Sequence, residues 1–165
     1  MTRSTILILS ALLTVPAACN RQPQSASTNT AATLVDRATE QRQYLAGLKP
    51  EQGWQATPSG LRYRRTGGNG SGPRPKPTDT VTLHYVGTLT DGTEFDSSVR
   101  RGEPVTMALP DLIPGWQEGV PLMSVGDRYE LAIPAEQGYG SRASGPIPAD
   151  STLLFTIDLL GIEGR

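Results

Sequence analysis

Hydrophobic and polar residues alternate along several short segments of this chain. Val81, Leu83 and Tyr85 occupy every second position of one such segment, with polar residues between them. The same period of two recurs in 129–133 and 153–159. Because successive side chains of an extended chain point to opposite faces, this pattern predicts strands with one buried face.

A turn and one short helix are predicted between these strands. Asp91-Gly92 is a dipeptide typical of tight turns and predicts a hairpin. The segment 114–120 predicts a helix, since proline suits a first helical turn and Trp116 and Val120 lie four apart on one face. Several antiparallel strands wrapped around one short helix make an α+β domain.

The first eighteen residues predict a signal peptide. Arg3 supplies a positive start, and the apolar run 6–15 is too short to span a bilayer. The small residues before Cys19 resemble a bacterial lipobox, which predicts lipidation of Cys19, although Pro16 stands where such boxes usually carry an aliphatic residue. The alternative is an ordinary secretory cleavage at either preceding alanine, which leaves Cys19 as a free thiol.

Three further segments follow. Residues 19–33 are rich in Gln, Ser, Thr, Asn and Ala, and predict a flexible tether. The segment 34–50 predicts one short amphipathic helix, with Gly47 and Pro50 as stop signals, and a docking or capping role. Residues 57–165 contain the predicted strands and short helix and form the main predicted domain.

Composition limits the classes of partner and the kinds of covalent cross-link that the chain can have. The 165 residues include 15 Lys+Arg and 16 Asp+Glu, so no basic field argues for nucleic acid. The basic residues in and around the Gly- and Pro-rich segment 67–77 are interpreted as a solvated loop. With a single cysteine, no intramolecular disulfide can form.

A set of apolar and aromatic residues with one carboxylate, between Thr57 and Ile162, resembles the pocket of the FKBP-type peptidyl-prolyl cis-trans isomerases in order and spacing. Its members are Tyr85, Phe95, Asp96, Val105, Met107, Leu112, Ile113, Trp116, Tyr139, Ile147 and Phe155. The resemblance implies an enzyme that accelerates rotation about X–Pro bonds in proteins that fold in the cell envelope. Its partners would be proline-containing polypeptides and macrolide inhibitors such as rapamycin.

Such a pocket suits this reaction. Rotation about an X–Pro bond faces a barrier of about 19 kcal/mol, because resonance gives the C–N bond partial double-bond character. The twisted amide is less dipolar than the planar one, so a dry apolar pocket favours the twisted form. Trp116 would form the base and Tyr85, Phe95, Ile113 and Phe155 the walls, with no nucleophile, metal or cofactor required.

The resemblance also assigns polar roles. The Ile113 backbone N–H and the Tyr139 hydroxyl would donate to bound carbonyl groups, and Asp96 would lie at the pocket edge, held by Arg100 or Arg101. Side chains that contact the substrate would be those of Val105, Met107, Leu112 and Ile147.

The sequence also allows functions other than prolyl isomerisation. Glu94 and Asp96 are two apart on a predicted strand and face opposite ways, which disfavours paired-carboxylate hydrolysis. His84 faces away from Tyr85 and is predicted to be inert. The main alternative is a non-catalytic module that binds proline-rich segments or acts as a chaperone on the same fold. A structural envelope lipoprotein with a vestigial pocket is more remote.

Two departures from the family affect the expected selectivity for ligands. Val105 replaces a bulky aromatic residue, and the loop 140–146 is shorter, so macrolides should bind more weakly than to small cytosolic members. A bulky aliphatic residue before proline should be preferred, packing near Phe95 and Ile147.

The predicted signal peptide also indicates a location. The protein is expected in the bacterial envelope, facing the periplasm and anchored to a membrane through Cys19.

Overall fold

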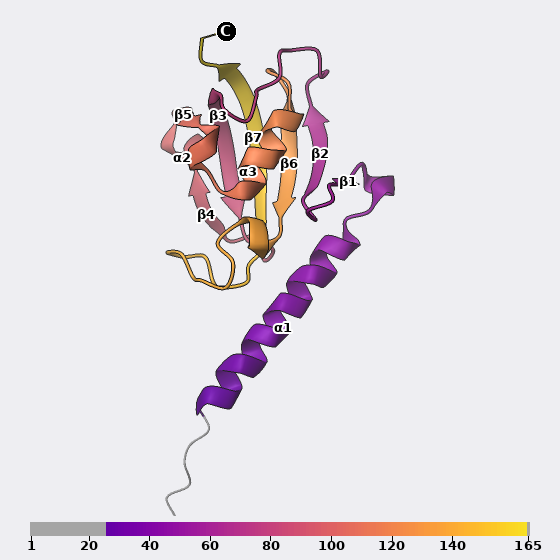
Figure 1. Cartoon of the computed structure of the whole chain (residues 1–165), viewed down its shortest axis with the longest axis vertical. Helices are drawn as coiled ribbons and strands as arrows, with labels where there is room; N and C mark the ends of the chain where they lie inside the picture. Colours follow the sequence, from indigo (N-terminus) through magenta and orange to yellow (C-terminus); the bar gives the residue numbers. More distant parts are fainter. Residues whose placement is uncertain (1–25, 165) are drawn as a thin grey trace, which may run out of the picture.

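The computed structural model describes the backbone of residues 26–164 and the side chains of residues 36–164. The predicted signal peptide, Cys19 and the first part of the predicted tether lie outside these residues. In chain order (Figure 1) the elements are α1 (Ala26–Gly47), η1 (Pro50–Gln52), β1 (Gln55–Ala56), β2 (Arg62–Gly67), β3 (Thr80–Thr88), β4 (Glu94–Ser97), α2 (Ser98–Arg101), β5 (Val105–Ala108), η2 (Leu109–Asp111), α3 (Pro114–Gly119), η3 (Val120–Leu122), β6 (Arg128–Ile133), η4 (Ala135–Gln137) and β7 (Leu153–Ile162).

One antiparallel sheet forms the body of the molecule. Its strand order is β1-β2-β6-β7-β3-β4, and β5 pairs with β3 beyond the end of β4. In the central β3–β7 pair, Leu83 lies opposite Leu159 and Tyr85 opposite Ile157. Residues opposite one another share a face of the sheet, and these side chains are buried. The alternation predicted along β3 is confirmed, since buried and partly buried positions alternate throughout the strand.

The helix α3 packs against the inner face of this sheet (Figure 1). Two glycines allow the close approach: a Cβ atom at Gly115 would lie 2.3 Å from Ile133 Cγ2, and one at Gly119 would lie 2.7 Å from Leu131 Cδ1. Trp116, between them, is only 4% exposed. The predicted α+β fold, an antiparallel sheet around one short helix, is confirmed.

The tight turn predicted at Asp91-Gly92 connects β3 to β4. Gly92 has φ 87°, a left-handed conformation that glycine adopts without steric cost. The backbone N–H of Leu89 donates to the carbonyl of Thr93 at 2.8 Å, and the Asp91 side chain accepts from the Thr93 N–H at 2.9 Å. These bonds fix the hairpin that carries β4.

The N-terminal boundaries differ from those expected. The helix α1 begins at Ala26 rather than residue 34, so the second part of the predicted tether is helical. Alanines in 26–33 have a high helix propensity, and adding residues to a nucleated helix costs little. The sheet also begins before residue 57, because β1 pairs with β2 and Trp54 is buried.

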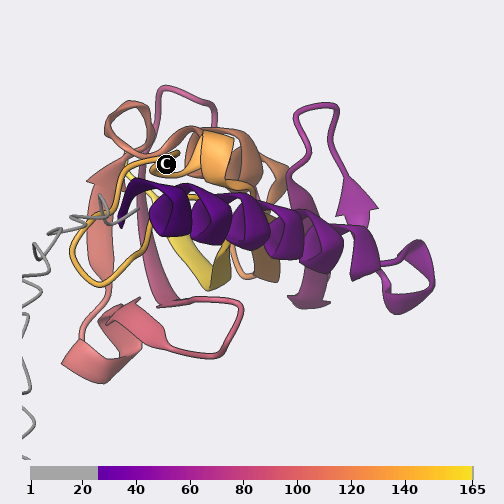
Figure 2. The same cartoon turned by 90° about the horizontal axis from the view of Figure 1, so that it is seen from below.

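Gln41 joins α1 to the rest of the domain. Its Nε2 donates to Thr90 Oγ1 at 3.2 Å, and its Oε1 accepts from the backbone N–H of Thr152 at 3.0 Å. One amide therefore ties the helix to the β3–β4 turn and to the residue that precedes β7. Seen from below, α1 lies across this end of the molecule (Figure 2).

Gln41→Ala should loosen α1 from the domain without unfolding the sheet. The change leaves the backbone N–H of Thr152, a residue only 1% exposed, without its acceptor, and such a loss costs about 1–3 kcal/mol. Hydrogen exchange should accelerate in α1 and around Thr152. Gln43→Ala is the matched control, because Gln43 is an exposed glutamine on the same helix. Equal exchange rates in the two variants would contradict the anchoring role of Gln41.

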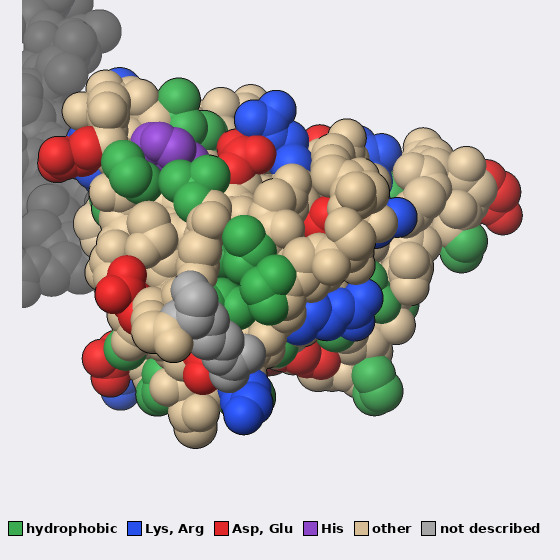
Figure 3. All heavy atoms as spheres, turned by 90° about the horizontal axis from the view of Figure 1, so that it is seen from above, with side chains coloured by type: hydrophobic (Ala, Val, Ile, Leu, Met, Phe, Trp, Pro, Cys, Tyr) green, Lys and Arg blue, Asp and Glu red, His purple; other side chains and the backbone are tan. Residues whose placement is uncertain are grey.

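On the face seen in Figure 3, basic and acidic side chains are interspersed. Within residues 26–164, no helix has both the length and the apolar character that a membrane crossing requires.

Candidate active site

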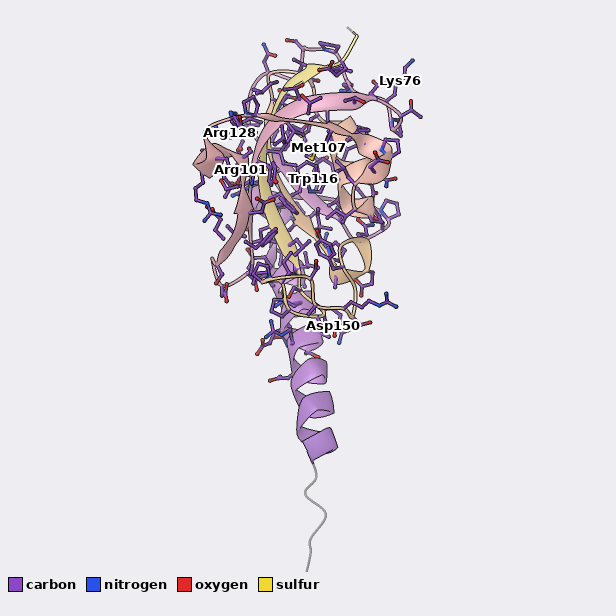
Figure 4. All side chains as sticks on the ribbon, turned by 90° about the vertical axis from the view of Figure 1, so that its left-hand side faces the viewer. Lys76, Arg101, Met107, Trp116, Arg128 and Asp150 are labelled. Atoms are coloured by element: carbon purple, nitrogen blue, oxygen red, sulfur yellow. The ribbon has the colours of Figure 1, made fainter. Side chains whose placement is uncertain are left out.

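A cavity of about 540 Å³ opens on the inner side of the sheet, between α3, β4, β5 and the loop that follows η4. In the side view of Figure 4, Met107 and Trp116 lie close together inside the domain. The cavity is lined by Tyr85, Phe95, Asp96, Met107, Asp111, Leu112, Ile113, Trp116, Tyr139, Ser144, Gly145, Pro146, Ile147 and Phe155.

Four aromatic rings form the base of the cavity. Trp116 and Phe155 meet edge to face with centroids 5.1 Å apart, and Tyr85 meets Trp116 at 5.3 Å with the rings nearly perpendicular. Phe95 contacts Phe155 in the same way at 5.6 Å. Edge-to-face contacts between aromatic rings add to the stabilisation from burial. The base is therefore an interlocked apolar surface with little freedom to rearrange.

Gly87, on β3, provides the space that two of these rings occupy. It lies opposite Phe155 across β3 and β7. A Cβ atom at this position would be 2.7 Å from two atoms of the Phe95 ring and 2.9 Å from Phe155 Cε1. The rings therefore rest on the bare backbone of β3. Sequence analysis did not single out Gly87, although a glycine within a strand often indicates a close approach.

A closed polar network borders the aromatic base. The Tyr85 hydroxyl donates to Asp96 Oδ2, and Arg101 Nη1 donates to Asp96 Oδ1. Arg101 Nη2 also donates to the Tyr85 hydroxyl at 3.1 Å, and the guanidinium lies 5.6 Å from the centre of the Tyr85 ring. Of the two arginines considered for Asp96, Arg101 is the partner, while Arg100 pairs with Glu94 at 3.2 Å.

The network sets the charges at this edge. Partial burial opposes ionisation of Asp96, but the hydrogen bonds from Tyr85 and Arg101 outweigh it and lower the pKa of the carboxyl group. Burial, reinforced by the bond to Asp96, raises the pKa of Tyr85. At neutral pH the carboxylate is ionised and the phenol neutral, so the network holds the Tyr85 ring against the cavity.

We expect this network to stabilise the fold at neutral pH and to lose part of that effect in acid. The side chain of aspartate in an unfolded chain titrates at about pH 3.9. Because the folded pKa of Asp96 is lower, its contribution is present above that value and is lost as the pH falls through the folded pKa. For Tyr85, whose folded pKa is raised, the contribution is present below about pH 10 and is lost as the pH rises through the folded pKa.

The measurement is the melting temperature as a function of pH. Asp96→Asn should flatten the fall on the acid side, whereas Asp36→Asn, which removes an exposed carboxylate on α1, should preserve it. An acid limb of the same steepness in wild type and Asp96→Asn would show that the network has no such effect.

The mouth of the cavity offers two hydrogen-bond donors. Tyr139 is 44% exposed, and its hydroxyl donates to no acceptor within residues 36–164. The backbone N–H of Ile113 is likewise unpaired within the described chain, because α3 begins at the next residue and uses only the Ile113 carbonyl. Gln117 fixes the preceding segment, since its Nε2 donates to the carbonyls of Pro110 at 3.1 Å and Leu112 at 2.7 Å.

A structured loop after η4 forms one wall. Ser144 and Ile147 exchange two backbone hydrogen bonds of 2.9 Å, and the Asp150 N–H donates to the Gly140 carbonyl at 2.9 Å. Asp150 itself has φ 57°, in the left-handed region that aspartate tolerates. Ile147 is only 5% exposed and anchors the loop to the core.

The arrangement of sheet, helix and cavity agrees with known proteins. The sequence model of the FKBP-type peptidyl-prolyl cis-trans isomerase family matches residues 72–160, more than half of the chain. The chain belongs to this family. Among solved structures, that of FkpA from Escherichia coli is similar with a TM-score of 0.77 and 38% identity, covering 84% of this chain and 64% of that one.

Curated FKBP-type relatives are also similar to this chain in sequence. The chain is 47% identical over 129 residues to FkpA of Aeromonas hydrophila, covering 78% of this chain and 48% of that protein. It is 52% identical over 94 residues to a peptidyl-prolyl cis-trans isomerase of Schizosaccharomyces pombe, covering 55% of this chain and 84% of that protein. The chain spans about half the length of the FkpA relative.

Within this FKBP-type domain, the structure brings together all the predicted pocket residues except Val105. Val105 lies opposite Leu83 across β3 and β5, packs against the core and is not among the residues that line the cavity, so its contact with substrate stays a prediction. Met107, on the same strand, lines the cavity. His84 lies away from the cavity, with Nδ1 3.0 Å from Ser98 Oγ.

The lining also includes residues that sequence analysis missed. Asp111 comes from η2, and three further residues come from the loop after η4, residues 138–150, which we call the wall loop. A three-residue helix and an irregular loop are without a repeating pattern that indicates which side chains face inward. The missed residues are Asp111, Ser144, Gly145 and Pro146.

Proposed function

We propose that this chain catalyses cis–trans isomerisation of the peptide bond before proline in polypeptides. The observation that carries the proposal is the cavity itself: an interlocked aromatic base, with Trp116 only 4% exposed, faced by two donors at the mouth. This arrangement matches what the reaction needs, because the twisted amide is less dipolar than the planar one and gains from an apolar surrounding. The catalytic domain extends from β1 to the end of β7.

The polar groups have distinct proposed roles. The Ile113 N–H and the Tyr139 hydroxyl bind substrate carbonyl groups on either side of the proline and hold the bond over Trp116. Asp96 and Arg101 position the Tyr85 ring, because their own charges are satisfied by one another. Binding energy realised more fully in the twisted state lowers the barrier, and each 1.36 kcal/mol gives about a tenfold increase in rate.

The test is an isomerisation assay on a short X–Pro peptide, whose spontaneous interconversion takes tens to hundreds of seconds. The purified protein should accelerate it, and a bulky aliphatic residue before proline should give the highest kcat/KM. The alternative, a non-catalytic module for proline segments, predicts that the same peptide binds while its interconversion rate stays unchanged. Measuring affinity and rate on one peptide separates the two.

We infer that the protein works in the bacterial envelope, facing the periplasm and held to a membrane by a lipid on Cys19. Support comes from the apolar run and the lipobox-like residues before Cys19, and from 41% identity over 121 residues to the outer membrane protein MIP of Legionella longbeachae. Two or more acyl chains give stable anchoring where a single chain does not. Cys19→Ser should move the protein from the membrane fraction to the soluble fraction or leave an unprocessed precursor. A soluble wild type with Ala18 or Cys19 at its N-terminus and no acyl chain would exclude lipidation.

We also propose that macrolides such as rapamycin bind this cavity. Its volume of about 540 Å³ and its aromatic base suit a large apolar ligand. The change in Trp116 fluorescence on titration reports binding, and a Trp54→Phe background removes the other tryptophan, which lies beside Arg64 outside the cavity. Unchanged Trp116 fluorescence and no inhibition at saturating macrolide would refute this proposal.

A further inference from the structure

The cavity mouth carries one negative charge that no neighbour balances. Among residues 36–164, two acidic residues line the cavity and no Lys or Arg does so. Asp96 is neutralised by its ion pair with Arg101. Asp111 is exposed, and within residues 36–164 its carboxylate makes no ion pair or hydrogen bond. The uncompensated charge therefore belongs to Asp111.

The position of Asp111 is fixed relative to the proposed reaction centre. It ends η2, two residues before Ile113, whose N–H is an open donor at the mouth. Gln117 holds the carbonyls on both sides of Asp111, those of Pro110 and Leu112. A charge on a restrained segment keeps its place, so it acts on a bound peptide at a defined point.

From this geometry we propose that Asp111 makes the enzyme selective for proline segments with a basic residue close to the proline. The inference rests on the proposed isomerase function and names its substrate class. A Lys or Arg side chain of the client meets the Asp111 carboxylate at the mouth while the proline ring contacts the aromatic base. A Glu or Asp at the same place is repelled. The wall-loop residues that line the cavity, Ser144, Gly145, Pro146 and Ile147, carry no charge, and Arg142 on the same loop is not among the lining residues.

The size of the effect follows from exposure. Exposed ion pairs contribute modestly, so kcat/KM should fall about two- to fivefold from a Lys peptide to a Gln peptide. A further fall of about the same size is expected from Gln to Glu. Salt screens exposed charges over about 10 Å at 0.1 M ionic strength and about 3 Å at 1 M. The preference should therefore shrink at high salt.

The experiment uses three X–Pro peptides that differ only by Lys, Gln or Glu at one position beside the X–Pro pair, with the variable position moved from one side to the other in a second set. We expect the order Lys, Gln, Glu in wild type, and nearly equal values in Asp111→Asn. Glu51→Gln is the matched control, because it removes one exposed carboxylate on η1, outside the cavity lining, and should keep the wild-type order.

Each result is decisive. Acceleration of all peptides to the same extent by wild type overturns the charge selectivity and leaves the isomerase function standing. An order that persists unchanged in Asp111→Asn also overturns it, since another group would then be the source. If no peptide is accelerated, the proposed function fails, and this inference fails with it.

Discussion

Trp116→Ala should lower kcat/KM by about ten- to a hundredfold while the sheet still folds. Trp116 is only 4% exposed and meets both Tyr85 and Phe155 edge to face, so its loss opens the base of the cavity to water. Burial of a large apolar side chain is worth about 1.5–3 kcal/mol, and each 1.36 kcal/mol of lost transition-state stabilisation is a factor of about ten in rate. Isomerisation kinetics on an X–Pro peptide measure the loss.

The control separates catalysis from stability. Trp54→Ala removes the other tryptophan, which is 8% exposed but lies beside Arg64 rather than in the cavity. Both changes should lower the free energy of unfolding, yet only Trp116→Ala should lower kcat/KM at a temperature where both variants are folded. Trp116→Phe should recover part of the rate, because a smaller ring keeps the base apolar. Equal rate losses at positions 54 and 116 would mean that the effect arises from general destabilisation.

The strands and the aromatic pocket could be predicted because they follow repeating rules. Alternation along β3 places Tyr85 on the buried face, and the hairpin at Asp91-Gly92 brings Phe95 and Asp96 beside it. The family resemblance supplied the remaining members of the base. Arg100 and Arg101 lie four and five residues after Asp96 in the sequence, so both could be proposed as partners of its carboxylate.

The sequence pattern did not indicate every side chain that lines the cavity, nor where the first helix begins. Val105 and Met107 are equivalent in strand period, so the period alone could not indicate that Met107 lines the cavity and Val105 does not. Asp111 ends the three-residue helix η2 and the wall loop is irregular backbone, and neither offers a period that indicates side-chain direction. The start of α1 was misplaced because polar composition alone suggested a tether, although the segment's alanines favour helix.

Gly87→Ala should damage the active site through a single added methyl group. The new Cβ would lie 2.7 Å from the Phe95 ring and 2.9 Å from that of Phe155, so both rings have to move. Inserting a methyl group into a packed site costs about 1–3 kcal/mol. The displaced rings would enter the cavity or lose their contact with each other. We expect a lower melting temperature and a fall in kcat/KM of about tenfold or more.

Gly161→Ala isolates the cause of that effect. Gly161 is also a strand glycine, in β7, with a φ outside the left-handed region, and a Cβ atom added there would meet no atom within 4 Å. Replacing such a glycine by alanine reduces the entropy of the unfolded chain and is neutral or stabilising by up to about 1 kcal/mol. The two variants therefore share the chemical change and differ in the space around it. If Gly87→Ala retains wild-type kcat/KM and melts like Gly161→Ala, the backbone of β3 does not set the position of the Phe95 and Phe155 rings. A loss confined to Gly87→Ala identifies Gly87 as a positioning residue for the aromatic base.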